Sequence, residues 1–226
     1  MMMMRKLFPG LSLLAVITLP GFSQSQEVLQ ADLSKIATGE GWVVVNRGAA
    51  VAFEEGRPVV TFDGRPGDGA AWLQDVEFQN GTIEVLIRGK NNPGRSFVGV
   101  AFRGVDDETY DAIYFRPFNF FADNAASLSH QVQYVSHPVN TWSRLREEHT
   151  GVYENEISNP PDPDGFFKAR IEIDNSEIRV YVNEASEPCL VVNELTDRVG
   201  GRVGLWMGNN SDGAFAELVL KPAGTR

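Results

Sequence analysis

The chain has 226 residues, with 20 Lys and Arg against 30 Asp and Glu, which gives a formal net charge of −10. So acidic a chain repels phosphates and anionic lipid headgroups at long range, which argues against nucleic acid and membrane surfaces as partners. The single cysteine, Cys189, cannot form a disulfide within the chain, and we expect it to be a small core residue in a buried strand.

The first 25 residues are predicted to be a secretory signal peptide. Arg5 and Lys6 precede an apolar stretch over residues 7–19, and small residues follow, which is the order of charge, apolar segment and cleavage region in such peptides. Cleavage after Ser23 and cleavage after Ser25 both fit. The apolar stretch is short and contains a proline, so a retained membrane anchor is not favoured. We therefore expect an extracytoplasmic protein, periplasmic or secreted, with no membrane insertion after cleavage.

Residues 26–226 are expected to form one β-sandwich domain. Short apolar-alternating segments recur between Gly, Asn, Asp and Pro turns, and no long helical pattern intervenes. The opening segments, up to residue 62, are expected to form a meander at one edge of a sheet. The strands predicted in the first part of the chain are 42–46, 50–53, 59–62, 70–73, 82–88, 97–103, 111–116 and 131–135.

The segment 138–165 has a different composition, with four prolines and clustered charges. We interpret it as a long excursion from the sandwich that carries a short helical turn over residues 142–148. Long loops on a compact domain often carry the functional residues.

The closing part of the chain has the clearest pattern. Residues 167–174 and 177–182 alternate on either side of Asn175-Ser176, which predicts a strand, a tight turn and a second strand. Further strands are predicted at 189–192, 202–207 and 215–220. The fold class is therefore all-β, a two-sheet antiparallel sandwich.

The order of this hairpin, then Gly201-Arg-Val-Gly-Leu-Trp206, then Ala214-Phe-Ala-Glu-Leu-Val-Leu220, resembles the closing half of concanavalin A-like lectin/glucanase jelly rolls. Laminin-G-like modules and the 3-keto-disaccharide hydrolase-like domains of secreted bacterial proteins share this layout. The resemblance covers most of residues 27–222 in pattern and rests on structural motifs. It implies two curved antiparallel sheets, with an oligosaccharide or polysaccharide bound on the concave one.

Alternation along the strands predicts which side chains face away from the core, because successive residues point to opposite sides of a sheet. On the outward face, Gly99 and Ala101 would leave a trough between carboxylate, guanidinium, phenol and amide groups. Such planar groups are suited to pairs of sugar hydroxyls. The residues expected on this polar face are Glu84, Arg103, Tyr114, Arg116 and Gln133.

Two tryptophans are candidate platforms for a sugar ring. Trp206 lies between Gly204 and Gly208 and points outward by alternation, so it would be a flat exposed surface unless a loop covers it. Trp142 lies in the excursion, where packing of the loop on the sandwich is the alternative. Asn119 and Arg116 are the polar members of an aromatic string from Tyr114 to Phe121, and Arg116 would either clamp a ligand or fix the loop through Glu84 or Glu147.

Glu84 is the candidate catalytic carboxylate, with Glu147 or Glu154 as a partner acid or base. The spacing Glu172-x-Asp174-x-x-Glu177 matches a motif of retaining glucanases, but the turn at residues 175–176 would put its two glutamates on different strands. Alternation then cannot place them together for double displacement, so we interpret the match as coincidental.

No metal site is predicted, because the three histidines lack the spacing of zinc ligands. No nucleophilic serine is predicted either, because no Ser/His/Asp arrangement stands out. Acidic residues at 106–111 or at 162 and 164 could hold Ca²⁺ through oxygen ligands, although solvated turn acids are the favoured interpretation.

The leading hypothesis is an exported carbohydrate-binding domain that holds a glycan on its concave sheet. The alternatives are a glycoside hydrolase of the 3-keto-disaccharide hydrolase-like or glucanase-like type, and a structural or adhesion module without a small ligand. A sheet blocked by its own loops would favour the last.

Overall fold

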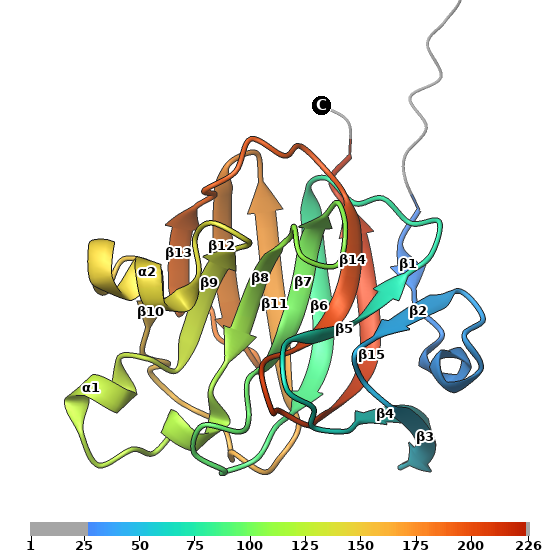
Figure 1. Ribbon diagram of the computed structural model, residues 1–226, viewed down its shortest axis with the longest axis horizontal. Helices are drawn as coiled ribbons and strands as arrows, with labels where there is room; N and C mark the ends of the chain where they lie inside the picture. Colours follow the sequence, from blue (N-terminus) through green and yellow to red (C-terminus); the bar gives the residue numbers. More distant parts are fainter. Residues whose placement is uncertain (1–26, 225–226) are drawn as a thin grey trace, which may run out of the picture.

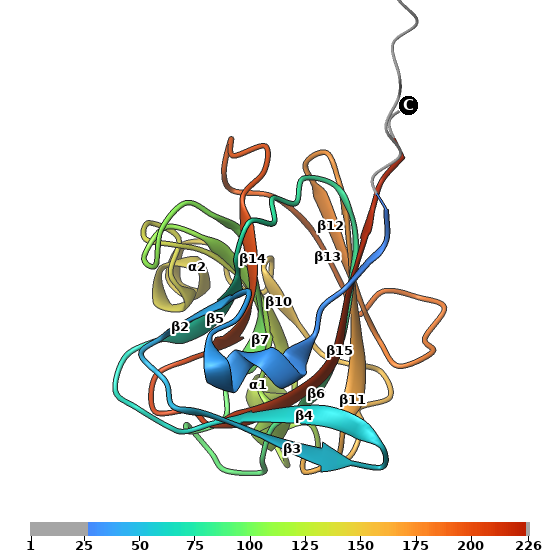
Figure 2. The ribbon, with the colours of Figure 1, turned by 90° about the vertical axis from the view of Figure 1, so that its right-hand side faces the viewer.

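The computed structural model describes residues 27–224, which form two antiparallel β-sheets packed face to face. Figure 1 shows the seven-stranded sheet in front of the eight-stranded one, and Figure 2 shows the two layers from the side. The predicted all-β jelly-roll sandwich is confirmed. The predicted signal peptide lies outside the described residues. Within residues 27–224, no helix is long and apolar enough to cross a membrane.

The eight-stranded sheet has the order β13-β12-β11-β6-β15-β4-β3, and β1 pairs with β15. Its strands are β1 (Leu29–Gln30), β3 (Ala49–Glu54), β4 (Arg57–Phe62), β6 (Gly81–Arg88), β11 (Phe167–Asp174), β12 (Glu177–Val182), β13 (Leu190–Asn193) and β15 (Gly213–Pro222).

The seven-stranded sheet has the order β10-β9-β8-β7-β14-β5-β2. Its strands are β2 (Trp42–Val45), β5 (Gly69–Leu73), β7 (Val98–Gly104), β8 (Asp111–Phe115), β9 (Val132–Ser136), β10 (Glu154–Asn155) and β14 (Arg202–Met207).

The core lies between the sheets and follows the predicted alternation. Every second residue of the central strands points inward and is buried with its counterparts from the facing sheet. The main favourable term is removal of this apolar surface from water. The inward residues predicted and observed include Ile83, Val85 and Ile87 on β6, Val98, Val100 and Phe102 on β7, and Val203, Leu205 and Met207 on β14.

Strands β11 and β12 form the predicted hairpin, with Asp174 paired to Glu177 and Asn175 in the left-handed conformation at φ 58°. Glu172 and Glu177 therefore lie on different strands, as expected from the turn. Each is bonded to an arginine on its own strand, Arg170 and Arg179 respectively.

The prediction of one opening meander is wrong. Strand β2 is the edge strand of the seven-stranded sheet, whereas β3 and β4 form a hairpin at the edge of the other sheet. The alternation within each segment does not specify which sheet the segment joins.

The helices are short and lie in the connections. The predicted helical turn is present as α2 (Trp142–Glu148), and Figure 2 shows it on the outer side of the seven-stranded sheet. The others are η1 (Leu33–Thr38), η2 (Pro117–Asn119) and α1 (Ala125–Leu128). Helices α1 and α2 lie beside β9 and β10 at one side of the sheet (Figure 1).

Candidate functional site

A pocket of about 690 Å³ lies on the outer face of the seven-stranded sheet. Its volume is within the range of small-molecule sites. Several loops and α2 contribute its walls. The lining residues are Asp68, Gly94, Phe97, Tyr114, Arg116, Phe118, Asn119, Ser127, His130, Val135, His137, Thr141, Trp142, Ser143, Arg146, Trp206, Gly208 and Asn209.

The floor of the pocket lies over one row of residues that crosses the sheet, and Tyr114 and Trp206 of this row line the cavity. Glu154 on β10 is opposite Gln133 on β9, which is opposite Tyr114 on β8; Gly99 on β7 and Trp206 on β14 continue the row. Cross-strand neighbours on one face are close enough for their side chains to touch. Five strands thus supply one continuous polar and aromatic surface.

Gly99 allows the two aromatic residues beside it to meet. The predicted trough exists in the backbone, but the rings of Tyr114 and Trp206 fill it, with centroids 5.0 Å apart. A Cβ at Gly99 would overlap the backbone of β8, so no larger residue fits there. Trp206 is 4% exposed and donates from Nε1 to the Tyr110 hydroxyl at 3.1 Å. It is therefore a part of the floor, and the expected flat exposed platform is wrong.

Tyr114, Arg116 and Gln133 are brought together as predicted, but they bond chiefly to one another. The Tyr114 hydroxyl donates to Gln133 Oε1 at 2.8 Å, and Arg116 Nη2 donates to both that oxygen and the Tyr114 hydroxyl. All three are buried. Burial raises the pKa of Tyr114 to about 12 and lowers the pKa of Arg116. Gln133 Nε2 is buried with no hydrogen-bond partner in the described part of the chain.

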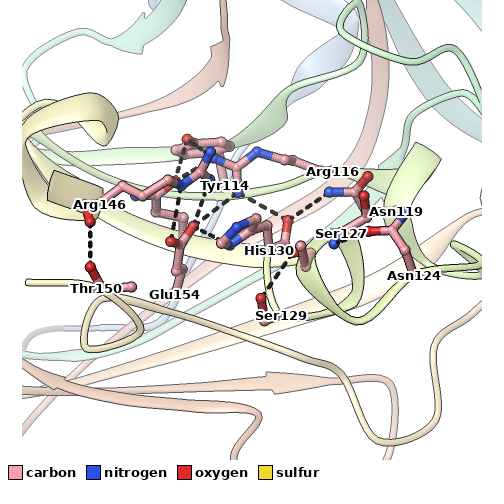
Figure 3. A network of polar contacts seen from close by, with 12 residues as sticks. Tyr114, Arg116, Asn119, Asn124, Ser127, Ser129, His130, Arg146, Thr150 and Glu154 are labelled. Carbon is pink, nitrogen blue, oxygen red and sulfur yellow. Dashed lines mark hydrogen bonds and ion pairs between the residues drawn. The ribbon is translucent and has the colours of Figure 1, made fainter.

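Glu154 is the centre of a charged cluster at the end of the row (Figure 3). Arg146 of α2 donates to it from Nε at 3.1 Å and from Nη2 at 2.8 Å, and Arg116 Nη1 lies 3.8 Å from Oε2. His130 Nδ1 lies 2.8 Å from the same oxygen. Burial lowers the pKa of His130, and the negative charge of Glu154 partly offsets this. The cluster fixes α2 and His130 to the sheet.

Asn119 lies at the α1 side of the pocket. Its Nδ2 donates to the His130 carbonyl at 3.1 Å, and Arg116 Nη1 donates to the same carbonyl at 3.0 Å (Figure 3). Asn124 begins α1 by accepting from the Ser127 backbone N–H at 2.8 Å. These bonds hold the segment that carries Ser127 and His130 against the sheet.

Trp142 is the aromatic residue that the pocket presents to solvent, with an exposed fraction of 52%. The Arg146 guanidinium lies 5.3 Å from the Trp142 ring centroid, which orients both side chains on α2. Leu145 anchors the helix by packing on the outer face of the sheet. Of the two predicted tryptophans, the one in the excursion is thus the accessible one.

Asp68 and His137 form the opposite rim with Tyr110. The Tyr110 hydroxyl donates to Asp68 Oδ2 at 3.2 Å, and the His137 ring stacks on the Tyr110 ring with centroids 5.0 Å apart. Burial raises the pKa of Tyr110 and lowers the pKa of His137. Asp68 is exposed, so its carboxylate is available to a ligand hydroxyl.

Glu84 is not on this face, and its predicted place beside Tyr114 is wrong. It lies on β6 of the other sheet, where it points outward between Lys168 and Lys221. Burial acts to raise the pKa of Glu84, but hydrogen bonds from the two lysines outweigh it and hold the pKa below its usual value. Alternation correctly predicted the outward direction but could not specify the sheet.

Arg103 is also away from the pocket. It has a positive φ of 54°, and a register shift between β7 and β14 lies beside it, so strict alternation ends there. The buried guanidinium donates to Glu194 Oε1 at 2.9 Å and to the Gln79 carbonyl at 2.7 Å. It connects loops at the end of the sandwich, and the predicted ligand-facing position is wrong.

Several pocket residues were missed as ligand contacts by the sequence analysis. His130, His137 and Asp68 lie in loops and Arg146 lies in α2, outside the strands whose alternation predicts a direction. The nearest signal in the sequence is the charge-rich excursion, where Glu154 is predicted only as a partner of Glu84. That pairing is wrong, because the two glutamates lie in different sheets.

The acidic turns have structural partners. Asp106 accepts from the backbone N–H groups of Glu108 and Thr109, and Asp111 is buried against Arg198 at 2.5 Å. Among residues 27–224, no group of three or more His, Cys, Asp or Glu side chains is arranged to hold a metal ion.

No family model matches the sequence, and no curated protein matches it. Solved structures do match the fold. A carbohydrate-binding module, CBM66 from Bacillus subtilis, aligns with a TM-score of 0.58 and 14% identity over 80% of this chain and 95% of that one. A mixed-linkage glucan GH16 protein from Bacteroides ovatus, solved with a G4G4G3G product, aligns with a TM-score of 0.55 and 8% identity over 84% of this chain and 98% of that one.

The exoplasmic/lumenal domain of VIP36, solved with Ca²⁺ and Man3GlcNAc, gives a TM-score of 0.53 and 12% identity over 82% of this chain and 85% of that domain. All of these matches cover most of both chains at low identity, so what they share with this chain is the arrangement of the two sheets. The chain has the fold of the concanavalin A-like jelly-roll domains.

Proposed function

We propose that this protein binds a neutral carbohydrate in the pocket beneath α2. The observation that carries the proposal is the combination of an exposed Trp142 ring with the hydrogen-bonding groups of Arg146, His130 and Asp68 around one cavity. An aromatic face suits the apolar side of a sugar ring, and planar or bidentate groups suit its hydroxyls. The solved structures with carbohydrate names or ligands support the same class of partner.

The charges around the pocket favour a neutral sugar. Arg146 and Arg116 are positive, and Glu154 and Asp68 are negative, so the rim has no net charge while the histidines are neutral. The whole chain is acidic, which opposes anionic ligands at long range.

Binding is favoured over glycoside hydrolysis by the state of the two carboxylates. A glycosidase needs two carboxyl groups that face the scissile bond, one of which can give up a proton. Here Glu154 is buried and bonded to Arg146, so it is not free to act on a ligand. Among the residues that line the pocket, this leaves the carboxylate of Asp68, which is exposed at the rim, without a second carboxyl group to act with it. A glycoside hydrolase remains the alternative, because one matching structure is a GH16 protein in complex with a G4G4G3G product.

We also propose that the protein works outside the cytoplasm. The charge and apolar order of residues 1–25 supports export, whether to the periplasm or to the medium. The third alternative is a module with no small ligand, and for such a module we would expect loops that block the outer face of the seven-stranded sheet. Helix α2 covers a part of the outer face, but an open pocket remains beside it.

The test is a panel of neutral oligosaccharides, with binding measured by calorimetry and cleavage by mass spectrometry of the same mixtures. We expect saturable binding in calorimetry and no change in the masses of the oligosaccharides. New cleavage products would support the hydrolase, and the absence of both binding and cleavage would contradict both readings. Arg146→Ala is expected to abolish binding, whereas Arg170→Ala, at a partly exposed position on the other sheet, serves as the matched control.

A further inference from the structure

We propose that the pocket receives the end of a glycan chain and excludes internal stretches of a polymer. This inference rests on the proposed function and concerns the class of ligand. A polysaccharide bound along its length must enter and leave a site at floor level, so it requires an open groove. Whether this pocket is an open groove or is closed at its ends depends on the residues that form its walls.

The row of floor residues is closed at the β10 end. Glu154 lies there with 2% of its side chain exposed, bonded to Arg146 and in contact with His130. Arg146 belongs to α2, whose Leu145 packs on the sheet. Because this wall is a buried ion cluster covered by a helix, a sugar chain cannot continue across β9 and β10 without breaking it.

The row is also closed on the β5 side. The Arg47 side chain is 5% exposed and fills the space over Gly69, donating to the Gly208 carbonyl at 2.7 Å and to the Gly67 carbonyl at 3.0 Å. The Gly67 backbone N–H in turn donates to Asn209 Oδ1 at 2.8 Å. These bonds join the loop before β5 to the loop after β14, and Asn209 faces the pocket from that junction.

The two remaining sides, which lie along the strand direction, carry aromatic walls. On one side the Phe97 and Phe118 rings meet edge to face, with centroids 5.4 Å apart. On the other side His137 is stacked on Tyr110, whose hydroxyl is bonded to Asp68 and Trp206. The pocket is thus bounded on four sides and opens away from the sheet. A ligand that enters by this mouth must end inside it.

The test compares one polysaccharide at two chain lengths. Neutral polymers (mixed-linkage glucan, mannan, xylan and galactan) are each cut by mild acid to shorter chains of the same composition, and the intact and the cut sample of each polymer are titrated by calorimetry. A blind pocket takes one chain end per protein. The number of protein-binding sites per gram of polysaccharide should therefore rise about tenfold when the chains are cut to about one tenth of their length. The dissociation constant per site should stay unchanged.

An unchanged number of sites per gram would overturn the inference and leave the proposed function standing. Failure of all polymers and of their acid-cut fragments to bind would overturn the proposed function, and this inference with it. Trp142→Ala in the same titration should weaken binding to both samples equally, because both present the same chain end to the pocket.

Discussion

Replacement of Glu154 by glutamine tests whether the charged cluster holds the pocket wall together. The carboxylate is 2% exposed, accepts two hydrogen bonds from Arg146 and lies near Arg116 and His130. Glutamine keeps the shape but removes the negative charge, so the buried Arg116 guanidinium loses its nearest carboxylate. We therefore expect Glu154→Gln to destabilise the protein markedly.

The magnitude follows from the cost of an unpaired buried charge. Removal of one partner of a buried ion pair costs about 3–5 kcal/mol, and the remaining amide contact reduces this to about 3 kcal/mol. For a domain of this size each kcal/mol corresponds to roughly 2–4 °C, so the midpoint of thermal unfolding should fall by roughly 6–12 °C.

Urea denaturation measures the free energy of unfolding, with Glu172→Gln as the matched control. Glu172 is bonded to Arg170 on the outer face of the other sheet, where both side chains are partly exposed, and such pairs contribute less than about 1 kcal/mol. If Glu154→Gln cost no more than Glu172→Gln, the cluster would not be the structural centre described above, and the argument for a fixed wall would be wrong.

Three other predictions concern the pocket and its floor. Trp142→Ala should raise the dissociation constant for the sugar about tenfold, since an aromatic contact contributes about 1–1.5 kcal/mol, without changing the unfolding midpoint. Phe53→Ala removes an exposed aromatic ring on β3 of the other sheet and should change neither quantity, and an equal loss of affinity in both variants would count against the site. Gly99→Ala should cost more than about 2 kcal/mol in urea denaturation because its Cβ would overlap β8, and a neutral result would show that the floor is not closely packed. Burial lowers the folded-state pKa of His130 and of His137 below the unfolded value of 6.5. The contribution of these neutral histidines to stability is therefore present above pH 6.5 and is lost as the pH falls through the folded-state pKa. Replacement of both histidines by glutamine should make the thermal midpoint fall less steeply between pH 7.5 and pH 5.5, and an unchanged slope would refute their role.

Local features of the fold could be predicted from the sequence because they depend on neighbouring residues. The hairpin of β11 and β12 follows from alternation on both sides of Asn175-Ser176, and α2 follows from the change of composition in the excursion. The partition of the opening strands could not be predicted, since β2 and β3 join different sheets through contacts with residues far away in the chain.

The candidate site shows the same limit. Tyr114 and Gln133 are paired on adjacent strands and Arg116 follows the end of β8 directly, so alternation correctly predicts that these three side chains lie together. The position predicted for Glu84 is wrong because alternation predicts whether a side chain points outward but not which sheet its strand joins. The position predicted for Arg103 is wrong because a register shift interrupts the alternation beside it. The burial of Trp206 depends on Gly99 in another strand, which no local pattern reveals.

A crystal structure of the protein with the sugar that binds in the oligosaccharide panel tests most directly whether the pocket beneath α2 is the binding site. We predict density for a terminal sugar unit in the pocket, against Trp142 and within hydrogen-bonding distance of Arg146. Ordered sugar elsewhere, such as on the outer face of the eight-stranded sheet around Glu84, with an empty pocket, would contradict it.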